Sequence, residues 1–195
     1  NSALKAAQPD ASVELWERSL VTEGERLDAY RSETVDALQG PVREAAETLL
    51  GVPVGIEYRP GHPQGMTLGD ALSANRGRDR KAGMTQVGPH RADLQLRLDD
   101  HKARGWVSRG QQKLLAASLV LGQAGLLAPL WGERGVLLID DPAAELDRTR
   151  CQALLELIAK SPFQVFVTAL DAAALPGFQA DATFHVEQGK VRRVV

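Results

Sequence analysis

The stretch that decides the fold is Val136-Leu137-Leu138-Ile139-Asp140-Asp141-Pro142-Ala143-Ala144-Glu145-Leu146-Asp147. Four apolar residues run without alternation into two neighbouring carboxylates. Such a run predicts a strand buried on both faces of a parallel α/β sheet. Open α/β sheets bind ligands at the carboxyl ends of their strands, where a carboxylate can hold Mg²⁺ together with phosphate oxygens and water. The alternative is a buried strand that ends in a solvated acidic turn.

A second segment, Ser108-Arg109-Gly110-Gln111-Gln112, precedes a run rich in helix formers that begins at Lys113. Ser108 is a suitable N-cap, and Gly110 lets the backbone approach a ligand closely. The free amides and the dipole of a helix N-terminus favour bound phosphate. Taken alone, the five residues fit an ordinary capped helix better. In this order, however, the two segments resemble the signature motif and the Walker B strand of ABC-type ATPases.

The residues after the paired acids extend this resemblance. In ABC-type ATPases the D-loop follows Walker B and lies along the dimer interface, a place held here by Glu145 and Asp147. A helix is expected from Arg148 to Lys160, and the β-rich run 163–168 is expected to form the neighbouring strand. Many ABC-type ATPases carry a switch histidine just after that strand, whereas this chain has Thr168. The difference argues against an ABC transporter subunit.

One further landmark is Val87-Gly88-Pro89-His90-Arg91-Ala92-Asp93-Leu94. With the motifs above, it makes the chain similar to the RecF family of bacterial recombination-repair ATPases. The resemblance is good from about residue 67 to the end and weaker in the helical first third. The resemblance implies an SMC-like fold, a cytoplasmic location and an ATP-dependent homodimer. It also implies binding to DNA at gaps or single-strand/double-strand junctions, and work with RecR and RecO in loading RecA.

The resemblance further implies roles for single residues. The signature residues would contact ATP held by the opposite protomer: Ser108, Arg109, Gly110, Gln111 and Gln112. Asp140 would hold Mg²⁺, and Asp141 would position or activate the attacking water as the catalytic residue. Thr168 would sense the terminal phosphate, and Asp147 would order the dimer interface. No role follows for His90.

No Gly-x-x-x-x-Gly-Lys-Ser/Thr loop occurs in the 195 residues, although an ABC-type ATPase needs one to hold the phosphates. We therefore expect the C-terminal part of a longer protein, and no ATP hydrolysis by this chain alone. The expected fold is α/β, with part of a helical lobe over 1–84 and the C-terminal part of an ABC/SMC-like ATPase head over 85–195. The alternatives are a non-catalytic dimerisation or partner-binding module, and the C-terminal half of another ABC-type ATPase.

Composition narrows the choice of partners. The net charge is −2 and the pI about 6.1, so overall charge gives no support to DNA binding. A local basic patch can contact phosphates or simply be a solvated helix end; it comprises Arg76, Arg78, Arg80, Lys81 and, further on, Arg91.

The single cysteine, Cys151, excludes an intramolecular disulfide, and no pair of Cys or His has zinc-site spacing. No apolar run approaches the roughly 20 residues of a membrane span, so no membrane partner is expected.

Periodicity predicts the remaining elements. A long amphipathic helix is expected from Val13 to about Gln39, broken or kinked at Gly40-Pro41 and continuing over 42–50 until Gly51. Strands are expected over 54–59 and 94–98, and a helix over 67–81. The chain should end in a hairpin whose turn is Gln188-Gly189.

Overall fold

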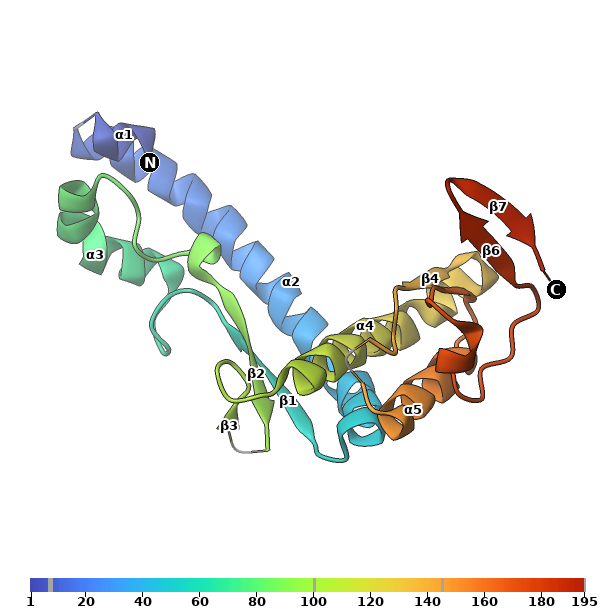
Figure 1. The fold of residues 1–195 in the computed structure, drawn as a ribbon. Coiled ribbons are helices and arrows are strands. Elements are labelled where there is room, and N and C mark those ends of the chain that lie inside the picture. The colour runs from blue at the N-terminus through green and yellow to red at the C-terminus, as the bar shows by residue number, and fades with distance from the viewer. Residues whose placement is uncertain (7–8, 100, 145, 195) are drawn as a thin grey trace. The chain divides into compact units, whose positions relative to one another are not determined.

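The computed structural model describes residues 1–6, 9–99, 101–144 and 146–194, which form two compact units (Figure 1). Unit 1 contains Asn1–Arg43 and Val52–Val107, and unit 2 contains Glu44–Gly51 and Ser108–Val195. Helices alternate with small parallel and antiparallel sheets, which confirms the predicted α/β class. The predicted lobe boundary after residue 84 lies within unit 1, and the division into lobes stays a prediction.

The first long element, α2, spans Asp10–Leu50 and continues through Pro41 as one helix, after the short α1, Ser2–Lys5. A full break at Gly40-Pro41 is therefore ruled out, although proline removes one helical hydrogen bond. Two contacts beside the proline favour the helix. Val42 is fully buried, and the side-chain amide of Gln39 donates to the backbone carbonyl of Ile56. The helix ends at Gly51, whose φ of 73° is left-handed, as predicted.

Unit 1 contains a three-stranded antiparallel sheet in the order β1–β2–β3, formed by Val54–Arg59, Asp93–Leu98 and His101–Lys102. Val54 pairs with Leu98 and Arg59 with Asp93, so β1 and β2 match along their whole length. Buried Val54, Ile56 and Leu98 form the apolar side of this sheet. Both predicted strands of this unit are confirmed.

The helix α3, Leu68–Ala82, begins at its N-cap Thr67 and ends at left-handed Gly83, which confirms the predicted helix. Its Asp79 is buried, and a carboxylate oxygen accepts the backbone N–H of Gln86 at 2.9 Å. This bond fixes the loop that leads to the 3-10 turn η1, Pro89–Arg91. The predicted Gly-Pro-His-Arg landmark is therefore an ordered turn, held also by the bond from Gly88 N–H to the carbonyl of Gly61 at 3.0 Å.

Unit 2 places two parallel strands beside two helices. The helix α4, Arg109–Trp131, is followed by β4, Val136–Ile139, then α5, Arg148–Ala159, and β5, Gln164–Val167. The strands β4 and β5 pair in parallel, with Ile139 opposite Val167. Their core is a cluster drawn from the end of α2, from α4 and from α5, namely Leu49, Leu114, Leu154 and Ile158, with Ile139 and Val165 packed against it.

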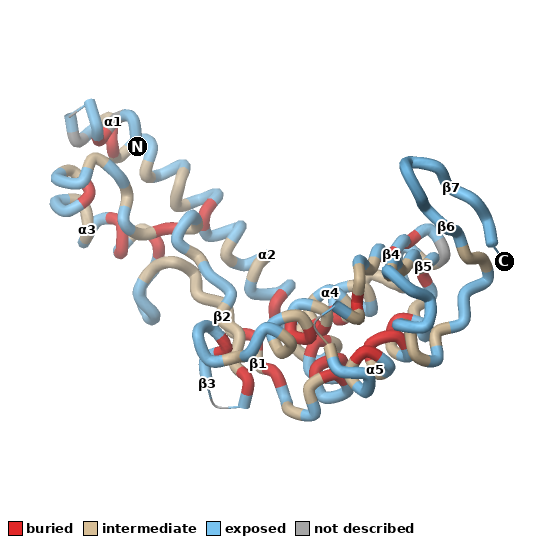
Figure 2. Tube along the Cα trace, viewed as in Figure 1, coloured by how far each residue is buried: buried red, intermediate tan, exposed pale blue. Residues whose placement is uncertain are grey.

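The strand β4 differs from the prediction in its burial (Figure 2). Leu137 is buried, but Val136 and Leu138 are 52% and 75% exposed, and Phe166 on β5 is 49% exposed. Alternate residues of a strand point to opposite faces. The apolar core of unit 2 thus covers one face of this two-stranded sheet, and the described residues leave the other face open. The prediction of burial on both faces is wrong for the described residues.

The chain ends in the predicted hairpin, formed by β6, Phe184–Glu187, and β7, Lys190–Arg193. Gln188 and Gly189 both have positive φ, 47° and 74°, as two-residue hairpin turns of type I′ require. Figure 2 shows the whole hairpin exposed. Two further 3-10 turns, η2 at Gly132–Arg134 and η3 at Ala172–Ala174, complete the described elements.

Among the described helices, α4 alone is long and apolar enough to cross a membrane, judged by length and composition only. Core helices of soluble proteins meet the same criterion. One side of α4 is buried within unit 2, at Leu114, Leu115, Ser118 and Gly122. This helix therefore offers only weak support for a membrane span, and the absence of a membrane partner stays a prediction.

We predict that the contribution of Asp79 to stability falls as pH rises. Burial raises the pKa of its carboxyl, against the lowering effect of the Gln86 backbone hydrogen bond. Because the folded state then holds the proton more tightly, this contribution is complete below the ordinary aspartate pKa of about 3.9 and shrinks as pH rises through the folded value. Asp79→Ala should therefore destabilise the chain most at about pH 4 and less at pH 7. The loss of the acceptor for the Gln86 N–H should cost roughly 1–3 kcal/mol of the free energy of unfolding.

Urea unfolding of the chain and of Asp79→Ala across this pH range measures the difference. A loss that is constant or that grows with pH would contradict the argument. Exposed Asp70→Ala would be a poor control because Asp70 bonds to Thr67, so Asp36→Ala, exposed on α2, is the matched variant.

Candidate nucleotide site at the end of β4

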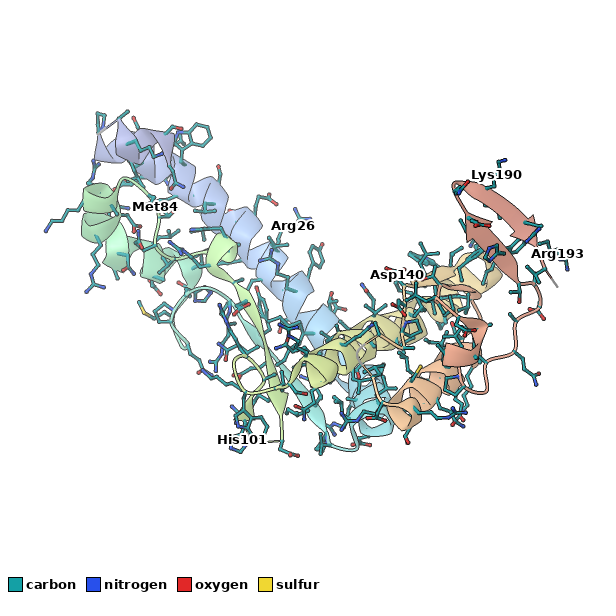
Figure 3. All side chains as sticks on the ribbon, viewed as in Figure 1. Arg26, Met84, His101, Asp140, Lys190 and Arg193 are labelled. Atoms are coloured by element: carbon teal, nitrogen blue, oxygen red, sulfur yellow. The ribbon has the colours of Figure 1, made fainter. Side chains whose placement is uncertain are left out.

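The paired carboxylates lie where the sequence places them, directly after β4; Figure 3 labels Asp140. Because Ile139 pairs with Val167, the next residues of the two strands, Asp140 and Thr168, lie side by side. The Thr168 hydroxyl donates to Oδ1 of Asp140 at 2.6 Å and accepts the backbone N–H of Asp141 at 3.0 Å. The backbone N–H of Thr168 in turn donates to the carbonyl of Ile139 at 2.9 Å. One threonine thus holds both acidic residues.

Asp141 has a left-handed backbone, with φ of 40°, which is uncommon for residues other than glycine and most tolerated by Asn and Asp. The carbonyl of Asp141 accepts a hydrogen bond from Nζ of Lys113 at 2.8 Å. Lys113 lies in α4, close behind the signature residues. The peptide groups on both sides of the Asp141 Cα are therefore bonded to side chains of other elements.

The signature residues form the start of α4. Ser108 is the N-cap, and it shares a capping box with Gln111. Ser108 Oγ accepts the Gln111 N–H at 3.3 Å, and Gln111 Oε1 accepts the Ser108 N–H at 2.9 Å. A helix leaves its first N–H groups without intrahelical partners. The capping box satisfies two of them, which leaves the amides of Arg109 and Gly110 as donors for a bound anion.

The capping box also restricts the predicted roles. The Oε1 of Gln111 is already engaged, so toward a phosphate or ribose this side chain has its two amide N–H groups to offer. Ser108 Oγ accepts within the box and keeps its hydroxyl hydrogen for donation. The prediction that these residues contact ATP stays a prediction.

In the expected D-loop, Asp147 is the N-cap of α5. Its Oδ1 accepts the backbone N–H of Arg150 at 2.9 Å, and its Oδ2 lies 3.5 Å from the Arg150 guanidinium. This local role explains an acid at this position without a partner subunit. The predicted role at a dimer interface stays a prediction. Glu145, the other residue predicted there, lies outside the described residues.

The donor set fits Mg²⁺ that is bound together with a phosphate. Two exposed or partly exposed carboxylates supply hard oxygen ligands, and Mg²⁺ in nucleotide sites takes one or two carboxylates plus phosphate oxygens. The described residues contain no group of three or more His, Cys, Asp or Glu that could hold a metal ion by themselves. Asp140 is the better ligand because its carboxylate is exposed and oriented by Thr168.

The basic patch in unit 1 separates into two kinds of residue. Arg76 is bonded to Glu14 at 2.8 Å and to Glu17 at 2.5 Å on α2, and its bond to Glu17 raises the pKa of its guanidinium. Arg78, Lys81 and Arg91 are exposed on α3 and η1, and Arg80 is half-buried. The ion pairs of Arg76 tie α3 to α2, so this arginine is occupied within its own unit.

Lys113 is a residue of the described site that the sequence motifs do not identify. Its partner, Asp141, lies 28 residues further along the chain, so no short motif contains both. The sequence hints at a role for Lys113 only through its position. It lies within two turns of the N-terminus of α4, where the helix dipole does not favour a positive charge.

Comparison with known proteins points to one family. The chain is 40% identical over 196 residues to the DNA replication and repair protein RecF of Stenotrophomonas maltophilia. Over 197 residues it is 36% and 37% identical to the proteins of that name from Azotobacter vinelandii and Pseudomonas paraeruginosa. Each match covers 98% of this chain but 53–54% of the relative, so the chain spans about half the length of the curated relatives it matches. No protein-family model matches the sequence.

Solved structures agree in fold. The structures of the recombination mediator protein RecF-ATP and RecF-ATPrS in the RecFOR pathway both match with a TM-score of 0.78. Their sequence identities to the chain are 24% and 23%. The first match covers 98% of this chain and 52% of the RecF chain, and the second covers 99% and 53%.

We predict that the capping box stabilises unit 2 even without a nucleotide. Ser108→Ala should lower its free energy of unfolding by about 1 kcal/mol because the Gln111 N–H loses its acceptor. Trp131, at the end of α4, can report the transition by fluorescence in a background with Trp16 and Trp106 changed to Phe. Ser32→Ala, exposed within α2, should change stability by less than about 0.5 kcal/mol. Equal effects of the two changes would show that the box contributes nothing.

Proposed function

We propose that the chain is part of a DNA repair and recombination ATPase of the RecF type. The premise is that the chain is RecF-like in sequence and in fold over nearly its whole length, which confirms the resemblance of its motifs. One observation in the structure carries the proposal. Thr168 bonds to the carboxylate of Asp140 and to the backbone N–H of Asp141, and Lys113 bonds the backbone carbonyl of Asp141 to α4, the helix that begins with the signature residues.

We propose that the start of α4 binds the terminal phosphate of an ATP molecule held by a second copy of the protein. The amides of Arg109 and Gly110 and the Ser108 hydroxyl are the available donors at this helix end. In this arrangement ATP contacts both subunits, so it would bind the dimer better than the monomer and favour dimerisation. The amide N–H groups of Gln111 and the side chain of Gln112 add contacts around the ribose or phosphates.

In this proposal Asp140 holds Mg²⁺, which neutralises charge that develops on the phosphate oxygens. Asp141 orients the attacking water and accepts its proton. Asp141 is shorter by one methylene than the glutamate that many ABC-type ATPases carry at this position. Because misplacements of about 1 Å can cost ~100-fold in rate, we propose slow hydrolysis. The left-handed backbone at Asp141 adds a reason for aspartate, since it tolerates this conformation better than most residues.

We propose that Arg78, Lys81 and Arg91 contact DNA phosphates, with Arg80 beside them on α3. Arg76 is left out of this set because Glu14 and Glu17 already neutralise it. The DNA would be gapped, or a junction of single and double strands. RecR and RecO type mediators are the proposed protein partners, consistent with the RecFOR pathway named for the structural neighbours. The cytoplasm is the proposed location.

We predict Mg²⁺-dependent ATP hydrolysis by the gene product that contains this chain together with a phosphate-binding loop. Asp141→Asn, which removes the base but keeps the shape, should lower kcat by at least ~100-fold with little change in ATP affinity. Ser108→Arg, which blocks the helix end, should abolish ATP-dependent dimerisation. The 195-residue chain alone should show no turnover, because it contains no such loop.

Steady-state turnover and nucleotide-dependent sedimentation measure these effects, with Ser32→Arg on α2 as the matched control for Ser108→Arg. Turnover that survives Asp141→Asn, or dimerisation that survives Ser108→Arg, would contradict the proposal. If neither substitution changes turnover or dimerisation, the alternative of a non-catalytic binding module would be favoured.

We predict that the arginines of α3 divide by function. Arg78→Ala with Lys81→Ala should weaken binding to gapped DNA, and the slope of log affinity against log salt should fall by roughly 1 to 2. Arg76→Ala should instead destabilise unit 1, because Glu14 and Glu17 lose their partner. Fluorescence anisotropy across a salt series and thermal unfolding separate the two effects. A salt slope unchanged in the double variant would remove these residues from the DNA contact.

A further inference from the structure

We infer that Thr168 and Lys113 together form a clamp on Asp141 that sets the direction of its carboxylate and connects it to the signature end of α4. The clamp consists of two side-chain hydrogen bonds to the backbone of one residue, whose carbonyl also accepts the Ala144 N–H at 3.2 Å within the same turn. Thr168 Oγ1 accepts the N–H of Asp141 at 3.0 Å, and Lys113 Nζ donates to its carbonyl at 2.8 Å. Together they fix the peptide groups on either side of the Asp141 Cα.

The backbone of Asp141 explains why a clamp is needed. Its φ of 40° lies in the left-handed region, which Asp adopts more readily than most residues with a side chain but which still costs energy relative to an ordinary φ. If the two side-chain bonds are lost, the turn keeps its local bond from the Ala144 N–H to the Asp141 carbonyl, but the Asp141 N–H is released and φ can relax. Because a change of φ rotates the Cα–Cβ bond, relaxation would turn the carboxylate away from its present direction. The clamp therefore acts on the position of Asp141, and both clamp residues are positioning residues.

The hydrogen-bond capacity of Thr168 supports this role over phosphate sensing. A threonine hydroxyl has one hydrogen and two acceptor lone pairs. The hydrogen is donated to Asp140 at 2.6 Å, and one lone pair accepts the Asp141 N–H. What remains is a lone pair, which cannot bond to an unprotonated phosphate oxygen. While Thr168 keeps these bonds, it orients the Asp140 carboxylate, holds the Asp141 backbone and has no donor for a nucleotide.

Lys113 gives the clamp its connection to the signature residues. Lys113 belongs to α4, the same rigid helix whose N-cap is Ser108. A shift of this helix end on binding a phosphate would move the Lys113 ammonium relative to Asp141. This coupling rests on the proposed function, because it needs ATP at the start of α4. The clamp itself rests only on the bonds within unit 2.

Amide hydrogen exchange tests the clamp in the full gene product without nucleotide. Thr168→Val should raise exchange at the Asp141 amide by roughly three- to tenfold, the effect of one lost hydrogen bond. Lys113→Met should raise it by a smaller factor, and Thr168→Ser should keep wild-type exchange because it retains the hydroxyl. Thr149→Val and Lys160→Met, both exposed on or just after α5, are the matched controls. Unchanged exchange at Asp141 in both clamp variants would overturn the clamp.

Turnover tests the positioning role. Thr168→Val and Lys113→Met should each lower kcat by about 10- to 100-fold, as for a misplaced group, while KM and Kd for ATP change less than about twofold. Thr168→Ser and Lys113→Arg should recover most of the rate.

A fall in ATP affinity equal to the loss in kcat/KM would make Thr168 a phosphate contact and overturn its assignment. Normal kcat in Lys113→Met would overturn the link to α4. Normal turnover in Asp141→Asn would instead overturn the proposed function, and with it any catalytic role for the clamp.

Discussion

The arrangement of Asp140 and Asp141 at the end of β4 depends on the hydrogen bonds of the Thr168 hydroxyl group. It exists because β4 and β5 pair in parallel with Ile139 opposite Val167, which brings the residues that follow each strand together. The hydroxyl then bonds to the side chain of Asp140 and to the backbone of Asp141. A register shift of one residue would separate these groups, so the chemistry at the end of β4 depends on the strand pairing.

Packing in unit 2 holds that pairing in place. Ile139 and Val165 lie against the cluster of Leu49, Leu114, Leu154 and Ile158, so one core joins the strands to α4, α5 and the end of α2. Lys113 precedes buried Leu114 on α4, and its ammonium group reaches the carbonyl of Asp141 from there. The same helix therefore contributes to the core and to the proposed nucleotide contact. The open face of the sheet, at Val136, Leu138 and Phe166, is the part of this unit that the described residues leave uncovered.

Local patterns predicted much of this structure. Helix formers after Ser108, the apolar run before Asp140 and the Gln-Gly turn at 188–189 each identify an element whose cause is local. The patterns failed where the outcome depends on distant residues. They left open a break or a kink at Gly40-Pro41; the helix is not broken there, and contacts of Gln39 and Val42 accompany its continuation. They predicted burial on both faces of β4, which needs covering elements that the strand itself does not specify. The bonds of Thr168 and Lys113 join residues 27 or 28 positions apart, beyond any short motif.

An experimental structure of the full gene product with Mg²⁺ and a non-hydrolysable ATP analogue would show directly whether Thr168 holds the two aspartates when nucleotide is bound. We predict that Thr168 still bonds to Asp140 and to the Asp141 amide, that Asp141 keeps its left-handed backbone, and that Lys113 stays on its carbonyl. We also predict that Ser108 lies at the terminal phosphate of the nucleotide bound by the other subunit. A Thr168 hydroxyl that has left Asp140 and donates to the terminal phosphate would show that Thr168 senses phosphate and does not hold the two aspartates.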